Sequence, residues 1–139
     1  MKFVHWALAA VVIGAVAGLV WPASADPLPM DNPVTADGVE TVCTGIGSEQ
    51  DDPRWKDYPV RVEFSNRAAQ YLAGAHVELT GNGKTLAAFD CAGSWVLFKL
   101  PAGSYKVSAS LLSHPGGVRS ATFSPPATGQ KRVVLQFPK

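Results

Sequence analysis

The most constraining feature of this sequence is a period-two alternation of apolar and polar residues that recurs from Pro59 to the end of the chain. Within residues 60–64, Arg61 and Glu63 separate apolar residues, and within residues 105–111 the odd positions are apolar. Successive side chains of a β-strand point to opposite faces of a sheet, so this alternation is typical of half-buried strands. The pattern predicts seven strands, at residues 60–64, 75–80, 84–91, 95–100, 105–111, 119–123 and 131–137.

Turn-forming residues separate nearly all of these runs. The pair Asn82-Gly83 favours a tight hairpin, because both residue types readily adopt positive φ angles. Residues 93–94, 101–103 and 114–117 are further turn signals. With no helical periodicity, the chain is predicted to form an all-β, seven-stranded antiparallel sandwich of immunoglobulin-like architecture. Parallel pairing is not expected, because the short connections leave no room for crossover helices.

The first 25 residues have the features of a signal peptide. A positive start at Lys2 precedes an apolar run of 16 residues from Trp6 to Trp21, which is short for a membrane span. Small residues then predict cleavage after Ala25, and an uncleaved anchor is the alternative. We therefore expect three parts: a signal peptide at 1–25, an irregular segment at 26–42 and a single β-sandwich domain at 43–139. The mature protein is expected to be periplasmic or secreted.

The charge balance excludes a general attraction to nucleic acid or to acidic membranes. Only Lys2 of the 12 basic residues precedes Asp26, so the mature chain has as many basic as acidic residues, 11 of each. Residues 26–52 contain acids and no base, whereas the chain after Asp90 contains bases and no acid. These bases are scattered singly, so mutual neutralisation within the fold is favoured over a basic patch for an anionic partner.

Both cysteines, Cys43 and Cys91, lie in the exported part of the chain. An even number of cysteines in an oxidising compartment predicts a disulfide, which would close a loop of about 48 residues. A redox role is the competing interpretation, but the sequence has no C-x-x-C motif and no adjacent histidine to lower a thiol pKa.

The segment at 42–55, VCTGIGSEQDDPRW, has the most site-like composition. Gln50 stands where a dinucleotide fingerprint needs its third glycine, and the nearby acids would repel phosphate. Calcium is the better chemical match for Glu49, Asp51 and Asp52, although the spacing is not that of an EF-hand. The structural alternative is a short helical turn before the first strand, capped by Ser48 or Asp52, with Pro53 at its first position.

Four residues are candidates for an interaction surface. They are Glu49, Arg54 and Trp55 in this segment, and Trp95 in a later strand. If Val96 and Phe98 fill the core, Trp95 and Leu97 lie on the opposite face. That pair would form a partner surface if exposed, and we expect it instead to be covered by residues 43–58.

Several segments resemble small exported bacterial carboxypeptidase regulatory-like domain proteins. These segments are TVCTGIGSE, YPVRVEFSN, YLAGAHVELTGNGKTL, WVLFKLPAGSYKVSA and the final RVVLQF. The resemblance implies a transthyretin-like, or prealbumin-like, seven-stranded sandwich and implies no particular reaction. Within it, Gly103 and Tyr105 form a corner in which the tyrosine hydroxyl can bond back to the turn backbone.

No catalytic constellation is visible in the sequence. Transthyretin-like hydrolases end in a Tyr-Arg-Gly-Ser tail that is absent here, and His76 and His114 are expected to be surface residues. We therefore predict a non-enzymatic binding or accessory domain, without cofactor or metal, whose partner is a protein or glycan of the cell envelope. A transthyretin-like hydrolase and a structural envelope protein without a small ligand are the alternatives. A concave surface that gathers two or more titratable side chains would favour the hydrolase.

Overall fold

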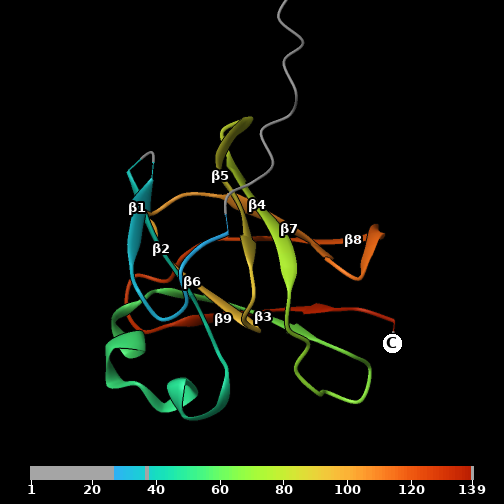
Figure 1. The fold of residues 1–139 in the computed structure, drawn as a ribbon. Helices are drawn as coiled ribbons and strands as arrows, with labels where there is room; N and C mark the ends of the chain where they lie inside the picture. Colours follow the sequence, from blue (N-terminus) through green and yellow to red (C-terminus); the bar gives the residue numbers. More distant parts are fainter. Residues whose placement is uncertain (1–26, 37, 139) are drawn as a thin grey trace, which may run out of the picture.

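The computed structural model describes residues 27–36 and 38–138, so the signal peptide expected at 1–25 lies outside the described residues. These residues form strands joined by turns and two short 3-10 helices (Figure 1). The strands are β1 (Val34–Ala36), β2 (Val39–Thr44), β3 (Val60–Ser65), β4 (Ala75–Gly81), β5 (Lys84–Cys91), β6 (Trp95–Lys99), β7 (Tyr105–Leu111), β8 (His114–Phe123) and β9 (Lys131–Gln136). The helices η1 (Gly47–Asp51) and η2 (Pro53–Asp57) lie between β2 and β3.

The strands form two sheets that share one apolar core. The first sheet has the strand order β1-β2-β6-β3-β9 and the second has the order β5-β4-β7-β8. Side chains of both sheets meet between the layers: the ring of Phe89 on β5 lies 6.3 Å from that of Phe98 on β6. The expectation of an all-β sandwich is confirmed at this level.

Each of the seven predicted strands overlaps one of the strands β3 to β9. On β4, Ala75, Val77 and Leu79 are fully buried while Glu78 is exposed, as a half-buried strand requires. The expected hairpin turn follows this strand, where Asn82 and Gly83 have φ angles of 53° and 73°.

The turn expected at residues 114–117 is misplaced, because these residues belong to β8 and the turn lies at 112–113. A proline can occupy this strand because β8 is an edge strand, with only β7 as its neighbour. The pairing of the two strands also shifts register between Ala109 and Leu111. Pro115 therefore interrupts little of the ladder.

The prediction of purely antiparallel pairing is wrong for one pair of strands. β3 and β9 are parallel, with Val60 opposite Lys131 and Ser65 opposite Gln136. Parallel neighbours need a long connection, which is usually a crossover helix. Here the chain between them passes through the second sheet, and this path supplies the connection that the short turns do not.

The prediction of an irregular segment at 26–42 is also wrong in part, since β1 and the start of β2 lie within it. β2 is buried on both faces: Cys43 points into the sandwich core, and Val42 belongs to a separate cluster on the other side of the sheet. A strand buried on both faces loses the period-two pattern by which the other strands are recognised.

The second cluster covers the outer face of the first sheet. It consists of Val42, Trp55, Tyr58 and Leu97. Leu97 is therefore fully buried, and Trp95 next to it retains 5% of its surface. The expectation that residues 43–58 cover this pair is confirmed for Leu97, which packs in one cluster with Trp55. Trp95 is also buried, but it contacts Arg61 and Tyr71, which lie outside that segment.

The predicted disulfide joins Cys43 to Cys91, with 5.6 Å between their Cα atoms. It connects β2 of the first sheet to β5 of the second. The corner after β6 also forms as expected, because the Tyr105 hydroxyl donates a hydrogen bond of 2.8 Å to the carbonyl oxygen of Pro101.

Candidate functional site

The site-like segment at 42–55 contains the end of β2 and continues into the two 3-10 helices on the outer face of the first sheet. Pro53 occupies the first turn of η2, and the Asp52 side chain accepts a hydrogen bond from the backbone N–H of Arg54. The short helical turn predicted before the first long strand is thus present. Asp52 caps it, as one of the two expected residues.

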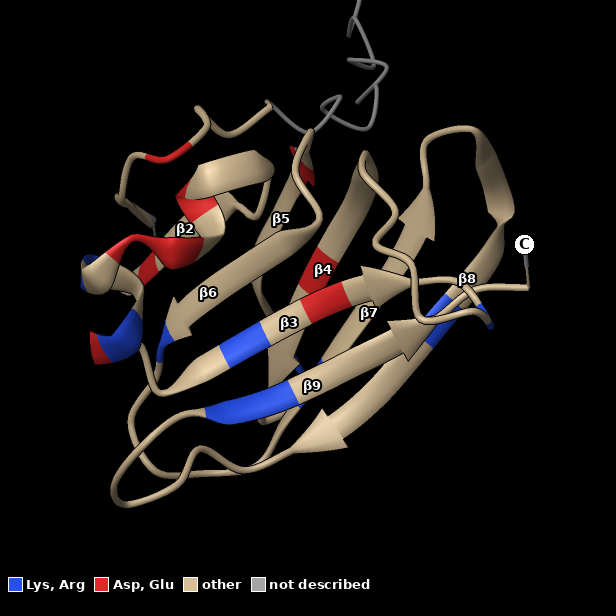
Figure 2. Ribbon diagram, turned by 90° about the horizontal axis from the view of Figure 1, so that it is seen from below, with Lys and Arg blue, Asp and Glu red and all other residues tan. Residues whose placement is uncertain are grey.

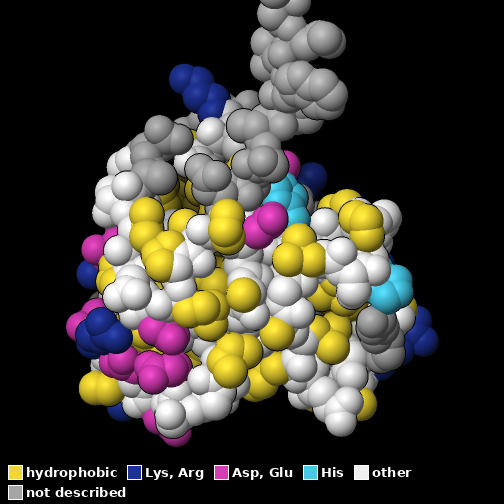
Figure 3. All heavy atoms as spheres, viewed as in Figure 1, with side chains coloured by type: hydrophobic (Ala, Val, Ile, Leu, Met, Phe, Trp, Pro, Cys, Tyr) yellow, Lys and Arg dark blue, Asp and Glu magenta, His cyan; other side chains and the backbone are white. Residues whose placement is uncertain are grey.

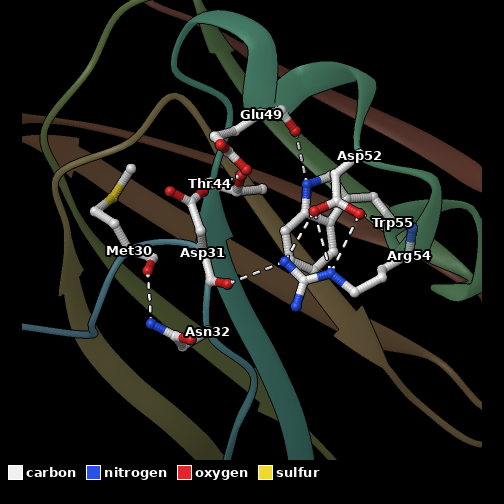
Figure 4. Close-up of polar contacts among 8 residues, drawn as sticks. All are labelled: Met30, Asp31, Asn32, Thr44, Glu49, Asp52, Arg54 and Trp55. Carbon is white, nitrogen blue, oxygen red and sulfur yellow. Dashed lines mark hydrogen bonds and ion pairs between the residues drawn. The ribbon is translucent and has the colours of Figure 1, made fainter.

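Trp55 fixes these helices to the sheet. Its side chain is buried in the cluster with Val42 and Leu97, and its indole N–H donates a 2.7 Å hydrogen bond to the carbonyl oxygen of Glu49 (Figure 4). The hydrogen bond joins η2 to η1, so one side chain orders both helices. Its burial is typical of a core residue and leaves little of the ring for a ligand.

Arg54 is paired within the same segment. Its guanidinium group donates to both carboxylate oxygens of Asp52, lies 4.6 Å over the ring of Trp55 and reaches the carbonyl oxygen of Asp31 (Figure 4). The hydrogen bonds from Arg54 hold the pKa of Asp52 below its ordinary value. The structure thus brings Glu49, Arg54 and Trp55 together and ties them to the N-terminal segment.

A pocket of about 180 Å³ separates these helices from Trp95, the fourth candidate residue. Lys56 and Arg61 provide two positive charges, and Asp51 and Asp52 provide two negative ones. Gln130 donates from its amide nitrogen to the carbonyl oxygens of Trp55 and Tyr58, at 2.8 and 3.0 Å. The full lining is Gln50, Asp51, Asp52, Trp55, Lys56, Arg61, Trp95 and Gln130.

The two glutamines of this pocket are held in fixed orientations. The amide nitrogen of Gln50 donates to the carbonyl oxygen of Gly45 at 2.7 Å, and that of Gln130 is occupied as described above. Among the described residues, no donor bonds to the amide oxygen of either glutamine. Each oxygen is thus a positioned hydrogen-bond acceptor.

Sequence reasoning missed a polar cluster beside this pocket, centred on Glu63. The Glu63 carboxylate has no exposed surface and accepts hydrogen bonds from Arg61 on its own strand and from Arg132 on β9. Burial opposes its ionisation, but the hydrogen bonds from Arg132 and Tyr71 outweigh this and lower its pKa. Figure 2 shows the charged bands of β3 and β9 side by side.

The parallel register brings the two arginines of this cluster together, because Arg61 pairs with Arg132. Arg61 also lies 4.4 Å over the ring of Trp95, and Tyr71 meets the same ring edge-on at 5.8 Å. The sequence offered one signal for the cluster, a glutamate two residues from an arginine on the polar face of a strand. Arg132 could not be assigned to it without the pairing of β3 and β9.

The two histidines among the described residues lie on the second sheet. His76 lies between two carboxylates, with its Nδ1 atom 2.8 Å from Asp90 and its Nε2 atom 3.3 Å from Glu78. Burial lowers the His76 pKa, but these hydrogen bonds outweigh it and raise the value above the ordinary 6.5. His114 is exposed at the start of β8. Figure 3 shows histidine side chains, coloured cyan, at the surface of the molecule.

His76 and Glu78 also line a shallow pocket of about 110 Å³ with Ser108 and Ser110. This is a concave surface that gathers two titratable side chains, which is the arrangement expected to favour a hydrolase. Within residues 27–36 and 38–138, no three His, Cys, Asp or Glu side chains are grouped as a metal ion would require.

The fold and the site define a disulfide-bonded β-sandwich with a polar pocket on the outer face of one sheet. No family model matches the chain, and no curated protein is similar to it in sequence. In the part of the chain that the structure describes, no helix has the length and hydropathy of a membrane span.

Proposed function

We propose that this protein is an exported, non-enzymatic binding or accessory domain of the cell envelope, and that its pocket beside η1 and η2 binds a neutral glycan. Export is supported by the apolar N-terminal sequence and by the disulfide between Cys43 and Cys91, because such bonds persist mainly in oxidising compartments. The hydrogen-bonding groups and charges that line the pocket are the reason for proposing a neutral glycan as the ligand.

A sugar hydroxyl both donates and accepts hydrogen bonds, so a sugar site needs both kinds of partner. Lys56 and Arg61 supply donors, Asp51 and Asp52 supply acceptors, and the oriented oxygen of Gln130 adds another acceptor. The formal charges of the lining residues cancel, which favours a neutral ligand over an anionic or cationic one. Trp55 and Trp95 also line the pocket, but both are largely buried and add only a small apolar surface to this polar lining.

A titration with three trisaccharides tests this proposal: neutral chitotriose, its deacetylated cationic form and trigalacturonic acid. Binding is followed by the indole N–H resonances of Trp55 and Trp95 in the mature protein. We expect saturable shifts with the neutral sugar and weaker ones with the two charged sugars. Exchanging exposed pocket residues, in Lys56→Ala and Asp51→Asn, should weaken binding several-fold, whereas Lys84→Ala in the distant β4–β5 turn should not. Indole resonances unmoved by all three sugars would refute the glycan proposal.

A hydrolase is the second candidate, favoured by His76 and its two carboxylates beside Ser108 and Ser110. The geometry suits this function less well, because both ring nitrogens of His76 are already engaged. Its raised pKa also favours the protonated imidazole, which cannot act as a general base. We expect no hydrolysis of a p-nitrophenyl ester above the rate given by His76→Gln. If the wild type hydrolysed the ester and His76→Gln did not, the hydrolase function would be supported.

We also propose that β3 to β9 form the seven-stranded prealbumin-like unit of a carboxypeptidase regulatory-like domain, with β1 and β2 added at one edge. The agreement of these seven strands with the predicted ones and the hydrogen bond from Tyr105 to Pro101 support this assignment. An experimental structure would test it through the strand order.

A further inference from the structure

β9 forms one edge of the first sheet, and no described residue pairs with its outer backbone groups. The N–H groups of Lys131 and Phe137 donate to Pro59 and Ser65, on the side of β3. Backbone direction alternates along a strand, so the N–H groups of Arg132, Val134 and Gln136 face away from β3. β8 of the other sheet runs close to β9 (Figure 2), but among the described residues no backbone hydrogen bond joins the two strands.

The side chains beside this edge form a patch, which we call the edge patch and define as Arg61, Tyr71, Arg132 and Val134. Val134 is opposite Glu63 in the parallel register, and burial together with the nearby Glu63 carboxylate raises the pKa of Tyr71. Tyr71 and Val134 each leave 42% of their surface exposed, and the Arg132 side chain leaves 57%. Tyrosine and arginine next to an exposed aliphatic residue are typical of the centres of protein interfaces.

The edge patch carries an excess of positive charge. Arg61 and Arg132 share one carboxylate, that of Glu63, and Lys131 at the start of β9 adds a further charge. An acidic strand would be complementary to this edge, and a basic strand would be repelled.

The other sheet edges are less suited to pairing with a second chain. The β5 edge is partly occupied, because the N–H of Leu28 donates to the carbonyl oxygen of Asp90 at 2.9 Å. β1 has three residues, and β8 contains Pro115 and two glycines. β9 offers six residues without proline or glycine.

From these observations we infer that the β9 edge binds an extended acidic segment of a partner polypeptide as an additional strand. Main-chain hydrogen bonds to Arg132, Val134 and Gln136 provide the pairing. On the outer face, an acidic side chain lies against Arg132, and an apolar side chain two residues away lies against Val134 and Tyr71. This site adjoins the glycan pocket but does not depend on it.

Binding of capped heptapeptides, in which every second residue is threonine, tests this inference. The acidic probe has the sequence Thr-Glu-Thr-Val-Thr-Glu-Thr, which reads identically in both directions and so suits parallel and antiparallel pairing. Its basic counterpart has lysine in place of glutamate. In two further acidic probes, every second backbone amide is N-methylated: the first carries the methyl groups on the odd-numbered residues and the second on the even-numbered residues. Only one of these two sets of amides can face β9, so methylation of that set should block the pairing.

We expect the acidic probe to shift the backbone amide resonances of Arg132, Val134 and Gln136 in the mature protein. The basic probe and one of the two methylated probes should bind at least fivefold more weakly. Lys131→Glu should weaken binding at least fivefold, since Lys131 is exposed and lies outside the ion pairs of Glu63. Lys84→Glu at the start of β5, on the edge of the second sheet opposite to β8, is the matched control and should have no effect.

Four results would overturn the inference. They are shifts centred on β1 or β8, equal binding of the acidic and basic probes, equal binding of both methylated probes, and no shift at the highest soluble probe concentration. Dimerisation that shifts the β9 amides without peptide would assign the edge to a second copy of the chain. None of these results affects the sugar titration, so the two proposals fail independently.

Discussion

At the residue scale, the ion pairs of Glu63 should contribute to the stability of the fold. Glu63 is a buried carboxylate in contact with two guanidinium groups, and its lowered pKa reflects those contacts. Glu63→Gln removes the charge but keeps the shape. We expect a loss of about 2 kcal/mol in the free energy of unfolding, a value typical of a hydrogen bond to a charged group. Urea unfolding measures this, with Asp51→Asn at an exposed position as the control.

The same pKa shift predicts the pH dependence. A carboxyl group with a lowered folded-state pKa stabilises the fold fully above its unfolded-state pKa, near 4.5, and loses this contribution as the pH falls through the folded-state value. Glu63→Gln should therefore be less sensitive to acid below about pH 4.5 than the wild type. An unchanged acid dependence would show that Glu63 is not stabilised by its two arginines.

His76 should produce the opposite dependence. Its folded-state pKa is raised above 6.5 by Asp90 and Glu78, while Ser110, opposite it on β7, does not titrate. The stabilisation is complete below the unfolded-state pKa and is lost as the pH rises through the raised folded-state value. We expect His76→Gln to remove a decline in stability that sets in as the pH rises above about 6.5. Parallel curves for the two proteins would contradict the ion pairs.

At the scale of the elements, the two glycines at the start of the 3-10 segment have different roles. Both have positive φ, 98° for Gly45 and 60° for Gly47. A Cβ atom on Gly45 would lie 2.7 Å from the Trp95 ring and 2.8 Å from the Ser94 hydroxyl, whereas one on Gly47 would meet nothing within 4 Å. Gly45 is therefore required by packing, and Gly47 by backbone conformation alone.

Alanine substitutions separate these two effects. Gly47→Ala should cost about 1 kcal/mol of unfolding free energy, the strain of a left-handed residue. Gly45→Ala adds overpacking against Trp95 and should cost about 3 kcal/mol in total. Thermal or urea unfolding of the pair checks this, and equal losses would contradict the close contact with Trp95.

The elements also show what the sequence could predict. Strands such as β4 have one buried face and one polar face, so the alternation of apolar and polar residues predicted them. The pair Asn82-Gly83 predicted the turn after β4. β2 lost this signal because both of its faces are buried: Trp55 covers Val42 on the outer face, and Cys43 lies in the sandwich core. The cluster at Glu63 was not predictable for another reason, because Arg132 reaches it only through a parallel pairing between residues about 70 positions apart. Local patterns carry no information on such pairings.

At the scale of the whole molecule, the N-terminal segment is attached to both sheets. Asp31 accepts a 2.6 Å hydrogen bond from Thr44 of β2, and Leu28 is bonded to Asp90 of β5. The disulfide joins the same two strands at Cys43 and Cys91. Residues 27–31, which begin two positions after Ala25, are thus integrated into the sandwich near the covalent link between its layers.

The disulfide should therefore contribute to the stability of the whole domain. It closes a loop with a sequence separation of 48, for which chain entropy allows up to about 4 kcal/mol. The double variant Cys43→Ala/Cys91→Ala should lose about this much unfolding free energy, and dithiothreitol should destabilise the wild type to the same degree without affecting the variant. A thiol assay on protein purified without reductant should detect no free thiol. Two free thiols in the native protein would remove the bridge and reopen a redox role, because both cysteines would then be available for exchange.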